Sequence, residues 1–241
     1  NTVNIVWDQV TGATGYDIEI DGVLSEDVQS PFIHNDLQPG TIHHYRLRAK
    51  NSSGNGKWTE IISKWTIPDK VTNLNTYATQ TVIVVSWEDV IGATAYDIEF
   101  DGKMLEEPLP SVSVSDLVPG TLYKYRVRAK NDSGAGVWSE EYSYWTIPDI
   151  VKQVISSASE TQIDITWDNT AGATGYDIEV NGEIHEDQSS PYTYMDLESG
   201  TKHIFRVRAK NSSGIGYWND ALEVWTLPGP IEGIEIQGMQ N

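Results

Sequence analysis

The chain contains no cysteine among its 241 residues. This absence excludes disulfide bridges, thiol nucleophiles and thiolate metal sites. It leaves the cellular compartment open, because proteins of oxidising compartments need not contain cysteine.

Basic residues are also scarce. The chain has 16 Lys and Arg against 35 Asp and Glu, which gives a formal net charge of −19. Nucleic-acid backbones and anionic lipid surfaces attract basic patches. We therefore expect neither nucleic acid nor an anionic lipid surface as a partner.

Long apolar runs are absent as well. No stretch is apolar for long enough to span a bilayer, which predicts a protein without membrane insertion. The opening stretch NTVNIVWDQV lacks the basic start and the apolar run of a secretory signal. We expect the sequence to be a piece of a longer protein.

Tryptophan, by contrast, is frequent and periodic. The 9 Trp residues fall into three sets, and the members of each set are 80 residues apart. Such regular spacing indicates tandem repeats, and a repeat of this length can form one small domain. The sets are Trp7, Trp87 and Trp167; Trp58, Trp138 and Trp218; and Trp65, Trp145 and Trp225.

Within each repeat, apolar residues alternate with polar ones. In YDIEID (16–21), Tyr16, Ile18 and Ile20 fall on one side of an extended chain and the acidic residues on the other. Residues 81–87 and 123–130 alternate in the same way, and Gly-containing turns separate such stretches. The pattern predicts an all-β fold with one sandwich of short strands in each repeat.

Proline marks the ends of the repeats. TIPD at 66–69 and at 146–149, and TLPGP at 226–230, predict boundaries there. These connections are short and contain no Gly- or Ser-rich run, so they should hold the repeats in a stiff, elongated array. The predicted domains are residues 1–68, 69–148 and 149–228, and residues 229–241 are predicted to be the orphan first strand of a following repeat.

The repeat resembles a fibronectin type III domain, over essentially the whole chain. The resemblance rests on a Trp in the second strand, a Tyr that opens the third, and the corner and sixth strand DLVPGTLYKYRVRAKNDSG at 116–134. The phrase GATGYDIE is similar to the domains of bacterial secreted glycoside hydrolases and surface proteins. The resemblance implies three tandem immunoglobulin-like β-sandwiches that serve extracellular spacing or binding rather than catalysis.

One position departs from the family pattern. Tyr123 matches the Tyr whose hydroxyl pins the corner before the sixth strand, but repeats one and three carry His43 and His203 there. An imidazole N–H can reach a backbone carbonyl much as a phenol does, so we expect a structural hydrogen bond. A metal site needs several convergent ligands, and we expect no metal.

Acidic and basic residues face each other across two strands that the resemblance makes antiparallel neighbours. Opposite charges across such strands contribute about 0.2–1 kcal/mol per pair. We therefore interpret them as a structural ladder on a soluble face of each sheet. The ladder comprises Asp17, Glu19, Arg46 and Arg48; Asp97, Glu99, Arg126 and Arg128; and Asp177, Glu179, Arg206 and Arg208.

The stretch DIEIDG also begins like a calcium-binding EF-hand loop. The twelfth position of that loop requires a bidentate Glu, and here it holds Val28, Pro108 or Gln188. This mismatch argues against calcium.

Two interpretations of the later tryptophan sets stay open. Arginine planes stacked on the indoles would form a cation–π ladder, whereas bare indoles would form a platform for sugars. The arginines nearby favour the ladder. The candidate binding surface comprises Trp58, Trp65, Trp138, Trp145, Trp218 and Trp225.

Catalysis has little support in the sequence. The polar residues either recur with the repeat or stand alone, and no phosphate loop or hydrolase motif occurs. We expect a protein that is not an enzyme and has no cofactor. We expect a non-catalytic spacer and protein-interaction module of a larger extracellular bacterial protein, secreted or at the cell surface, whose partners are other domains of the same polypeptide or other proteins. The alternative is an accessory carbohydrate-binding module that contacts polysaccharide through its tryptophans.

The two ends of the chain are complementary. Residues 69–80 and 149–160 supply the first strand of repeats two and three, whereas repeat one starts at its second strand. Residues 229–241 resemble a spare first strand, because Ile231 aligns with Val71 and Val151. Either the boundaries of the sequence happen to fall there, or the spare strand of one copy pairs with repeat one of another and builds a head-to-tail filament.

Overall fold

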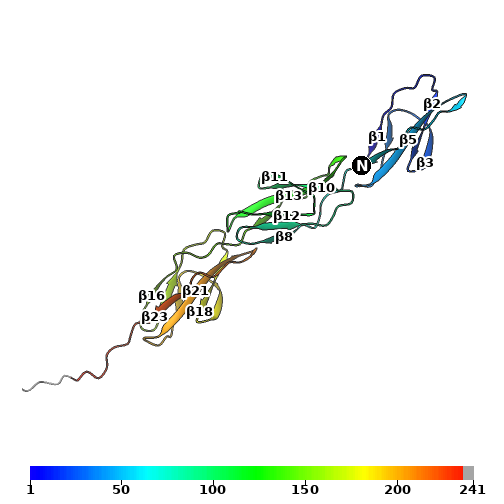
Figure 1. Cartoon of the computed structure of the whole chain (residues 1–241). Helices are drawn as coiled ribbons and strands as arrows, with labels where there is room; N and C mark the ends of the chain where they lie inside the picture. The colour runs from blue at the N-terminus through cyan, green and yellow to red at the C-terminus, as the bar shows by residue number, and fades with distance from the viewer. Residues whose placement is uncertain (236–241) are drawn as a thin grey trace, which may run out of the picture. The chain divides into compact units, whose positions relative to one another are not determined.

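A computed structural model describes residues 1–235, which form β-strands and no helix (Figure 1). The strands build six sheets, two within each repeat. The prediction of an all-β fold is therefore confirmed. By their contacts the residues divide into two compact units, one made of 1–76, 85–112 and 124–143 and the other of 77–84, 113–123 and the residues from 144 onward.

Repeat one (1–68) contains a two-stranded sheet, β1-β4, and a larger sheet in the order β3-β2-β5-β6, with β7 also paired to β5. The strands are β1 (Val3–Ile5), β2 (Gly15–Ile20), β3 (Val23–Val28), β4 (Phe32–His34), β5 (Ile42–Asn51), β6 (Gly54–Asn55) and β7 (Ile62–Trp65).

Repeat two (69–148) has a three-stranded sheet, β12-β9-β8, and a larger sheet in the order β11-β10-β13-β14, with β15 paired to β13. The strands are β8 (Asn75–Ala78), β9 (Ile83–Ser86), β10 (Ala95–Phe100), β11 (Lys103–Glu107), β12 (Ser111–Val114), β13 (Leu122–Asn131), β14 (Gly134–Ala135) and β15 (Tyr142–Trp145).

Repeat three (149–228) has the same arrangement. Its smaller sheet has the order β16-β17-β20, and its larger sheet the order β19-β18-β21-β22 with β23 paired to β21. The strands are β16 (Ile155–Ala158), β17 (Ile163–Thr166), β18 (Gly175–Val180), β19 (Glu183–Gln188), β20 (Tyr192–Tyr194), β21 (Lys202–Asn211), β22 (Gly214–Ile215) and β23 (Leu222–Trp225).

A two-residue turn fixes the register of β2 on β3. Ile20 pairs with Val23, so Asp21 and Gly22 form the turn, with φ of 50° and 83°. Positive φ at both residues matches the right-handed twist of the strands, and Asp-Gly adopts it readily. The turn therefore keeps Ile18, which has no exposed surface, on the core face of β2.

The core of repeat three lies between its two sheets. Apolar residues that alternate along β17, β18 and β21 meet there and are almost fully buried. The buried cluster comprises Val151, Ile163, Ile165, Trp167, Ile178, Val180, Phe205, Val207, Ala209 and Val224.

The core of repeat one is smaller. Its buried cluster contains only Ile18, Ile20 and Tyr45, while Val3 and Ile5 of β1 are partly buried. The cause is the smaller sheet, which has two strands here and three in each of the other repeats.

The predicted orphan strand at 229–241 is only partly described. Residues 229–235 form no strand and pair with no other segment of the described chain. Residues 236–241 lie outside the described residues.

Candidate functional site

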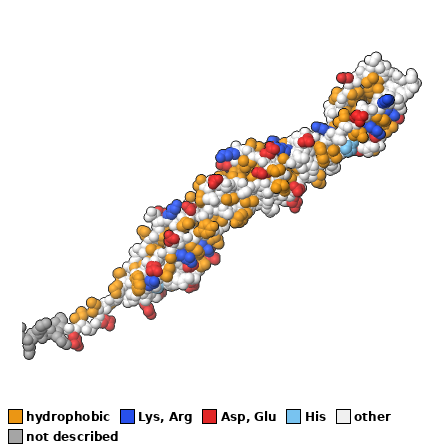
Figure 2. All heavy atoms as spheres, in the orientation of Figure 1, with side chains coloured by type: hydrophobic (Ala, Val, Ile, Leu, Met, Phe, Trp, Pro, Cys, Tyr) orange, Lys and Arg blue, Asp and Glu red, His pale blue; other side chains and the backbone are white. Residues whose placement is uncertain are grey.

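Each repeat pairs an acidic strand with a basic strand in its larger sheet. In repeat one, β2 and β5 are antiparallel, with Asp17 opposite Arg48 and Glu19 opposite Arg46. The same register recurs between β10 and β13 and between β18 and β21. In Figure 2, acidic and basic side chains lie interspersed on the visible face.

The opposed side chains form ion pairs in all three repeats. Arg46 Nη2 lies 2.6 Å from Glu19 Oε2, and Arg48 Nη2 lies 2.9 Å from Asp17 Oδ2. The equivalent pairs are Arg126–Glu99 (2.6 Å), Arg128–Asp97 (2.8 Å), Arg206–Glu179 (2.6 Å) and Arg208–Asp177 (2.9 Å). The ladder residues are therefore partnered within their own repeat.

A lysine links each ladder to a third strand. Lys50 Nζ lies 2.6 Å from Asp17 Oδ1 and 2.8 Å from Asp27 Oδ1, and Asp27 belongs to β3. Lys130 and Lys210 make the corresponding pairs in repeats two and three. Sequence analysis did not place Asp27 in this site, although Asp187 recurs in repeat three at the same position.

The ladder aspartates do not lie on a solvated face, and the expectation of a soluble face is wrong for them. Asp17 and Asp177 are 1% exposed and Asp97 is 9% exposed. In repeat one the reason is that Arg48 and Lys50 bind the Asp17 carboxylate and shield it from solvent. Alternation of the sequence indicates the face of a strand, but not how deeply that face is covered.

The charges of each site stabilise one another. Burial alone would raise the pKa of the Asp17 carboxyl, but hydrogen bonds from Lys50 and Arg48 outweigh it and hold that pKa below its ordinary value. The pKa of Asp97 and that of Asp177 are lowered by the same balance. Hydrogen bonds to Asp17 and Asp27 raise the pKa of Lys50.

One tryptophan in each repeat is covered by the arginines of the ladder. The Cζ atoms of Arg46 and Arg48 lie 4.9 Å and 4.5 Å from the ring centre of Trp58. The corresponding distances are 4.8 Å and 4.4 Å at Trp138, and 5.4 Å and 4.3 Å at Trp218. These distances are within the range of cation–π interactions, so each indole packs against the two arginines of its own repeat.

The second tryptophan of each repeat does not join this stack. Among the described residues, no guanidinium lies over Trp65, Trp145 or Trp225. Trp65 pairs with Ile42 at the far end of β5, away from Arg46 and Arg48. The idea of two stacked tryptophans per repeat is therefore wrong. Trp65 and Trp145 are half-buried, whereas Trp225 is 59% exposed.

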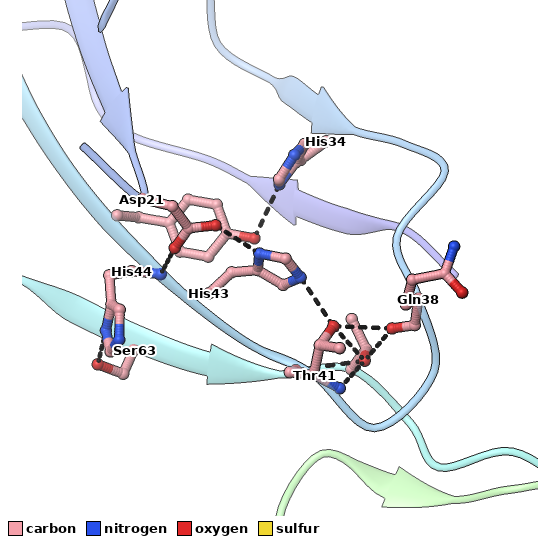
Figure 3. A network of polar contacts seen from close by, with 9 residues as sticks. Asp21, His34, Gln38, Thr41, His43, His44 and Ser63 are labelled. Carbon is pink, nitrogen blue, oxygen red and sulfur yellow. Dashed lines mark hydrogen bonds and ion pairs between the residues drawn. The ribbon is translucent and has the colours of Figure 1, made fainter. Parts of the chain in front are cut away.

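His43, which stands in repeat one where Tyr123 stands in repeat two, belongs to a polar network (Figure 3). His43 Nδ1 lies 2.6 Å from Asp21 Oδ2, and His43 Nε2 lies 2.9 Å from Thr41 Oγ1. Close by, His34 Nδ1 lies 3.1 Å from the Tyr45 hydroxyl, and burial lowers the pKa of His34. The expected bond from His43 to a backbone carbonyl is replaced by these side-chain contacts.

The corners of the other repeats differ in their partners. In repeat three, His203 contacts Asn181 Nδ2 at 3.0 Å and Thr201 Oγ1 at 2.9 Å. In repeat two, the Tyr123 hydroxyl accepts a hydrogen bond from the Val118 N–H at 2.9 Å, as the resemblance implies. Tyrosine and histidine therefore hold the same corner through different contacts.

The contacts from Asp21 through His43 to Thr41 have the order of an orienter, a base and a hydroxyl nucleophile. The hydroxyl of Thr41, however, donates to the carbonyl oxygen of Gln38 at 2.8 Å. Because the Thr41 proton points to Gln38, His43 Nε2 faces the oxygen of the Thr41 hydroxyl and cannot take up its proton. This arrangement holds the corner but does not activate the hydroxyl.

Buried threonines at the repeat ends were missed in the sequence. Thr66 is 3% exposed, and its hydroxyl accepts from the Thr41 N–H at 2.8 Å and donates to the Gln38 carbonyl at 2.7 Å. Thr146 and Thr226 are 0% and 2% exposed and make equivalent bonds. The recurrence of WTIP and WTLP every 80 residues was the available signal.

No group of three or more His, Asp or Glu side chains is placed to hold a metal ion in the described part of the chain. No helix within residues 1–235 is long and apolar enough to cross a membrane.

The family model described as "Fibronectin type III domain" matches residues 69–144 and 150–225, which together make up more than half of the chain. The chain therefore belongs to the fibronectin type III family. The two matched segments lie in tandem and coincide with repeats two and three.

Relatives differ widely in kind. The chain is 26% identical to the fibronectin type-III domain-containing protein 3a of Gallus gallus, over 80% of this chain and 19% of that protein. It is also 26% identical to endoglucanase B of Cellulomonas fimi, over 92% of this chain and 25% of that protein. The chain thus spans about a fifth to a quarter of the length of these relatives.

Solved structures are similar as well. The chicken CNTN1 FN1-FN3 domains have 18% sequence identity to this chain, a TM-score of 0.40, and coverage of 94% of both chains.

Proposed function

We propose that the chain is a non-catalytic segment of three tandem fibronectin type III-like sandwiches, in an elongated array, that spaces other modules of a larger protein and contacts protein partners. The observation that supports this most is the internal use of the polar site. The ladder arginines bind acidic residues of the same repeat and cover a tryptophan of the same repeat. Side chains engaged in this way strengthen a sheet and are not available for catalysis.

Contacts at the ends of the repeats support a spacing role. Asn131 Nδ2 donates to the Thr66 carbonyl at 2.8 Å, and Asn211 Nδ2 donates to the Thr146 carbonyl at 2.9 Å. Each bond joins the turn after a long strand to the end of the preceding repeat. Together with the proline of each connection, it limits the torsions that are free to bend.

The proposed setting is a secreted or cell-surface bacterial protein. Membership of the fibronectin type III family and the similarity to the Cellulomonas enzyme support this setting. The domain boundaries that go with it are 1–68, 69–148 and 149–228.

Small-angle X-ray scattering of the 241-residue chain tests the spacer. We expect an elongated particle with a narrow distribution of lengths. A broad distribution that extends to compact forms would contradict a stiff spacer.

A second candidate function is carbohydrate binding, which one observation favours. In repeat three, Trp225 and Tyr217 are 59% and 67% exposed. Exposed aromatic faces are suitable for stacking on sugar rings, and one relative is named an endoglucanase. A panel of polysaccharides, with tryptophan fluorescence as the readout, tests this function. A response that persists in Trp225→Ala would exclude this indole as the platform.

A further inference from the structure

The turn between β18 and β19 consists of Asn181 and Gly182. Both residues are exposed at the tip of the hairpin, with φ of 52° and 90°. The equivalent Asp-Gly turns at 21–22 and 101–102 are exposed as well, although another repeat follows each of them. Exposure is therefore a property of this turn in every repeat.

The backbone nitrogen of Gly182 is free to react. Asparagine is one of the thermolabile residues of proteins, and a glycine after it leaves the next backbone nitrogen open to the asparagine side chain. A Cβ on Gly182 would have no neighbour within 4 Å among the described residues. The Gly182 N–H donates no turn or loop hydrogen bond in the described part of the chain. A nucleophile is thus available beside the side-chain amide of Asn181.

The side-chain amide of Asn181 has a partner at each of its two polar atoms. The Ile204 N–H donates to Asn181 Oδ1 at 2.9 Å, and Asn181 Nδ2 lies 3.0 Å from His203 Nδ1. A donor at Oδ1 draws electron density away from Cγ and stabilises the negative charge that develops on this oxygen when a nucleophile attacks. The Ile204 N–H therefore lies where it favours attack on the amide.

The hydrogen bonds of His203 direct its Nδ1 atom to the amide nitrogen. The Thr201 hydroxyl donates to the Glu198 carbonyl at 2.7 Å, so its oxygen accepts from His203 Nε2 at 2.9 Å. The neutral ring then carries its proton on Nε2 and accepts from Asn181 through the lone pair of Nδ1. A proton taken up at Nδ1 lies beside the nitrogen that must leave when the amide is broken.

Repeat one shows how a carboxylate is held at the same position (Figure 3). Asp21 stands where Asn181 stands in repeat three. Its Oδ2 lies 2.6 Å from His43 Nδ1, and its Oδ1 accepts from the His44 N–H at 2.8 Å. Burial alone would raise the pKa of the Asp21 carboxyl, but hydrogen bonds from His43 and from the His44 N–H outweigh it and lower that pKa. The contacts around this turn thus accept an acid in place of an amide.

We propose that Asn181 is a site of spontaneous deamidation, in which the backbone nitrogen of Gly182 attacks the side-chain carbonyl carbon and His203 protonates the nitrogen that leaves. The free N–H of Gly182, the donor at Oδ1 and the imidazole at Nδ2 support it together. The proposal adds a chemical modification to the spacer function and does not depend on it.

The overall reaction consumes water and releases ammonia. In the first step a bond forms between the Gly182 nitrogen and Cγ of Asn181, and the bond between Cγ and Nδ2 breaks. His203 donates a proton to Nδ2, and the proton lost by the Gly182 nitrogen replaces it, so ammonia leaves and a cyclic succinimide remains. Water then adds a hydroxyl group to either carbonyl carbon of the ring and a proton to its nitrogen. Opening at Cγ gives aspartate, which pairs with His203 as Asp21 pairs with His43, and opening at the backbone carbonyl carbon gives isoaspartate.

The chain contains a matched control at Asn55 and Gly56, which form the same dipeptide in an exposed turn of repeat one. Here the glycine N–H is engaged, because it donates to the Ala49 carbonyl at 2.8 Å. Asn55 itself pairs with Lys50 between β5 and β6. Folding should therefore restrain the nucleophile at Asn55 and leave it free at Asn181.

Peptide mapping by mass spectrometry of the 241-residue chain, followed over time in buffer and in urea, tests the proposal. In the folded chain we expect aspartate and isoaspartate to accumulate several-fold faster at position 181 than at position 55. Conversion at position 181 should be at least as fast in the folded chain as in urea, whereas folding should slow conversion at position 55. The variant Asn181→Asp supplies the reference for the aspartate product and should still convert at Asn55.

His203→Tyr tests the proton donor. Tyr123 occupies the equivalent position of repeat two, so the fold should accept this change. We expect conversion at Asn181 to be several-fold slower than in the parent at about pH 6, below the ordinary pKa of histidine, and the difference to shrink at about pH 8.5. A purely structural role of His203 would give the same ratio of rates at both pH values. Conversion at Asn55 should be equal in the two chains.

Three results would overturn the proposal. The first is conversion at Asn181 that is no faster than at Asn55 in the folded chain. The second is slower conversion at Asn181 in the folded chain than in urea, which would mean that the contacts of the amide protect it. The third is a ratio of parent to His203→Tyr rates that does not change with pH, which would remove His203 from the reaction. None of these results bears on whether the array is stiff, which the scattering experiment measures separately.

Discussion

Asp177 shows what a single residue of the ladder contributes. Its carboxylate is 1% exposed and binds both Arg208, at 2.9 Å, and Lys210, at 2.6 Å. Asp177→Asn removes the charge, which leaves Arg208 without its counterion and Lys210 with only Asp187. Removing one partner of a buried pair costs about 3 kcal/mol, so we expect repeat three to lose stability by roughly that amount.

Glu179→Gln is the matched control for Asp177→Asn. Glu179 pairs with Arg206, whose side chain is 37% exposed, and solvent screens this pair. We expect a loss of about 1 kcal/mol or less. Hydrogen exchange of the β18 and β21 amides measures both variants locally, which avoids assuming one transition for the whole chain. Equal losses would mean that burial of Asp177 contributes nothing.

His34 gives repeat one a pH dependence of its own. Burial, and then the nearby charge of His43, lower the pKa of His34 from its ordinary value of 6.5, while Asp21 opposes the shift. The unfolded chain therefore takes up this proton at a higher pH than the folded chain does. As pH falls below 6.5, the unfolded state binds more protons and repeat one loses stability until the folded histidine is also protonated.

The variant His34→Tyr isolates this contribution, because Tyr194 occupies the equivalent position in repeat three. We expect the urea midpoint of repeat one, followed by NMR, to fall between about pH 7.5 and about pH 5.5 in the parent and to fall less in the variant. Repeat two contains no histidine and serves as the internal control. An identical fall in parent and variant would assign the effect to another group.

At the scale of strands, the ladder should depend on the pairing of opposite charges rather than on the presence of arginine. Arg126→Glu with Arg128→Glu places like charges opposite Glu99 and Asp97. Each pair contributes about 0.2–1 kcal/mol when the charges are opposite and is destabilising when they are alike. The double variant should therefore lower the melting midpoint of repeat two.

The complementary exchange provides the control for this charge reversal. Adding Asp97→Arg and Glu99→Arg restores opposite charges with the strands swapped, and we expect it to recover part of the lost stability. It should not recover all of it, because Trp138 stacks on the original arginines at 4.8 Å and 4.4 Å. An unchanged midpoint in the first double variant would show that the ladder is not structural.

The predictability of these elements follows from what local sequence encodes. Alternation and the 80-residue period were enough to predict the strands, and the resemblance to the fibronectin type III domain implied that the acidic strand lies beside the basic one. They could not predict that Asp17 is buried, since its cover comes from side chains of another strand. For the same reason, the sequence did not distinguish Trp58, which arginines cover, from Trp65, which lies at the other end of β5.

The tight contacts at the repeat ends could not be predicted from the sequence either. A glycine in the sequence indicates only a possible turn, whereas in the structure a Cβ on Gly92 would lie 2.2 Å from Gly40 O. A periodic glycine is equally consistent with an isolated turn. The structure separates the two roles, because Gly12 has the same conformation and no such neighbour within the described residues.

At the scale of the whole molecule, these glycines allow a direct test of stiffness. Gly92 has φ +70° and Gly12 has φ +80°, so Gly92→Ala and Gly12→Ala carry a similar backbone strain of about 1–2 kcal/mol. Only the alanine at position 92 would also collide with the backbone at Gly40, where repeat one meets repeat two. We expect Gly92→Ala to loosen this junction and Gly12→Ala to leave it intact. Small-angle scattering should then show a broader distribution of lengths for Gly92→Ala alone. If both variants scatter like the parent, the close approach at Gly40 does not stiffen the array.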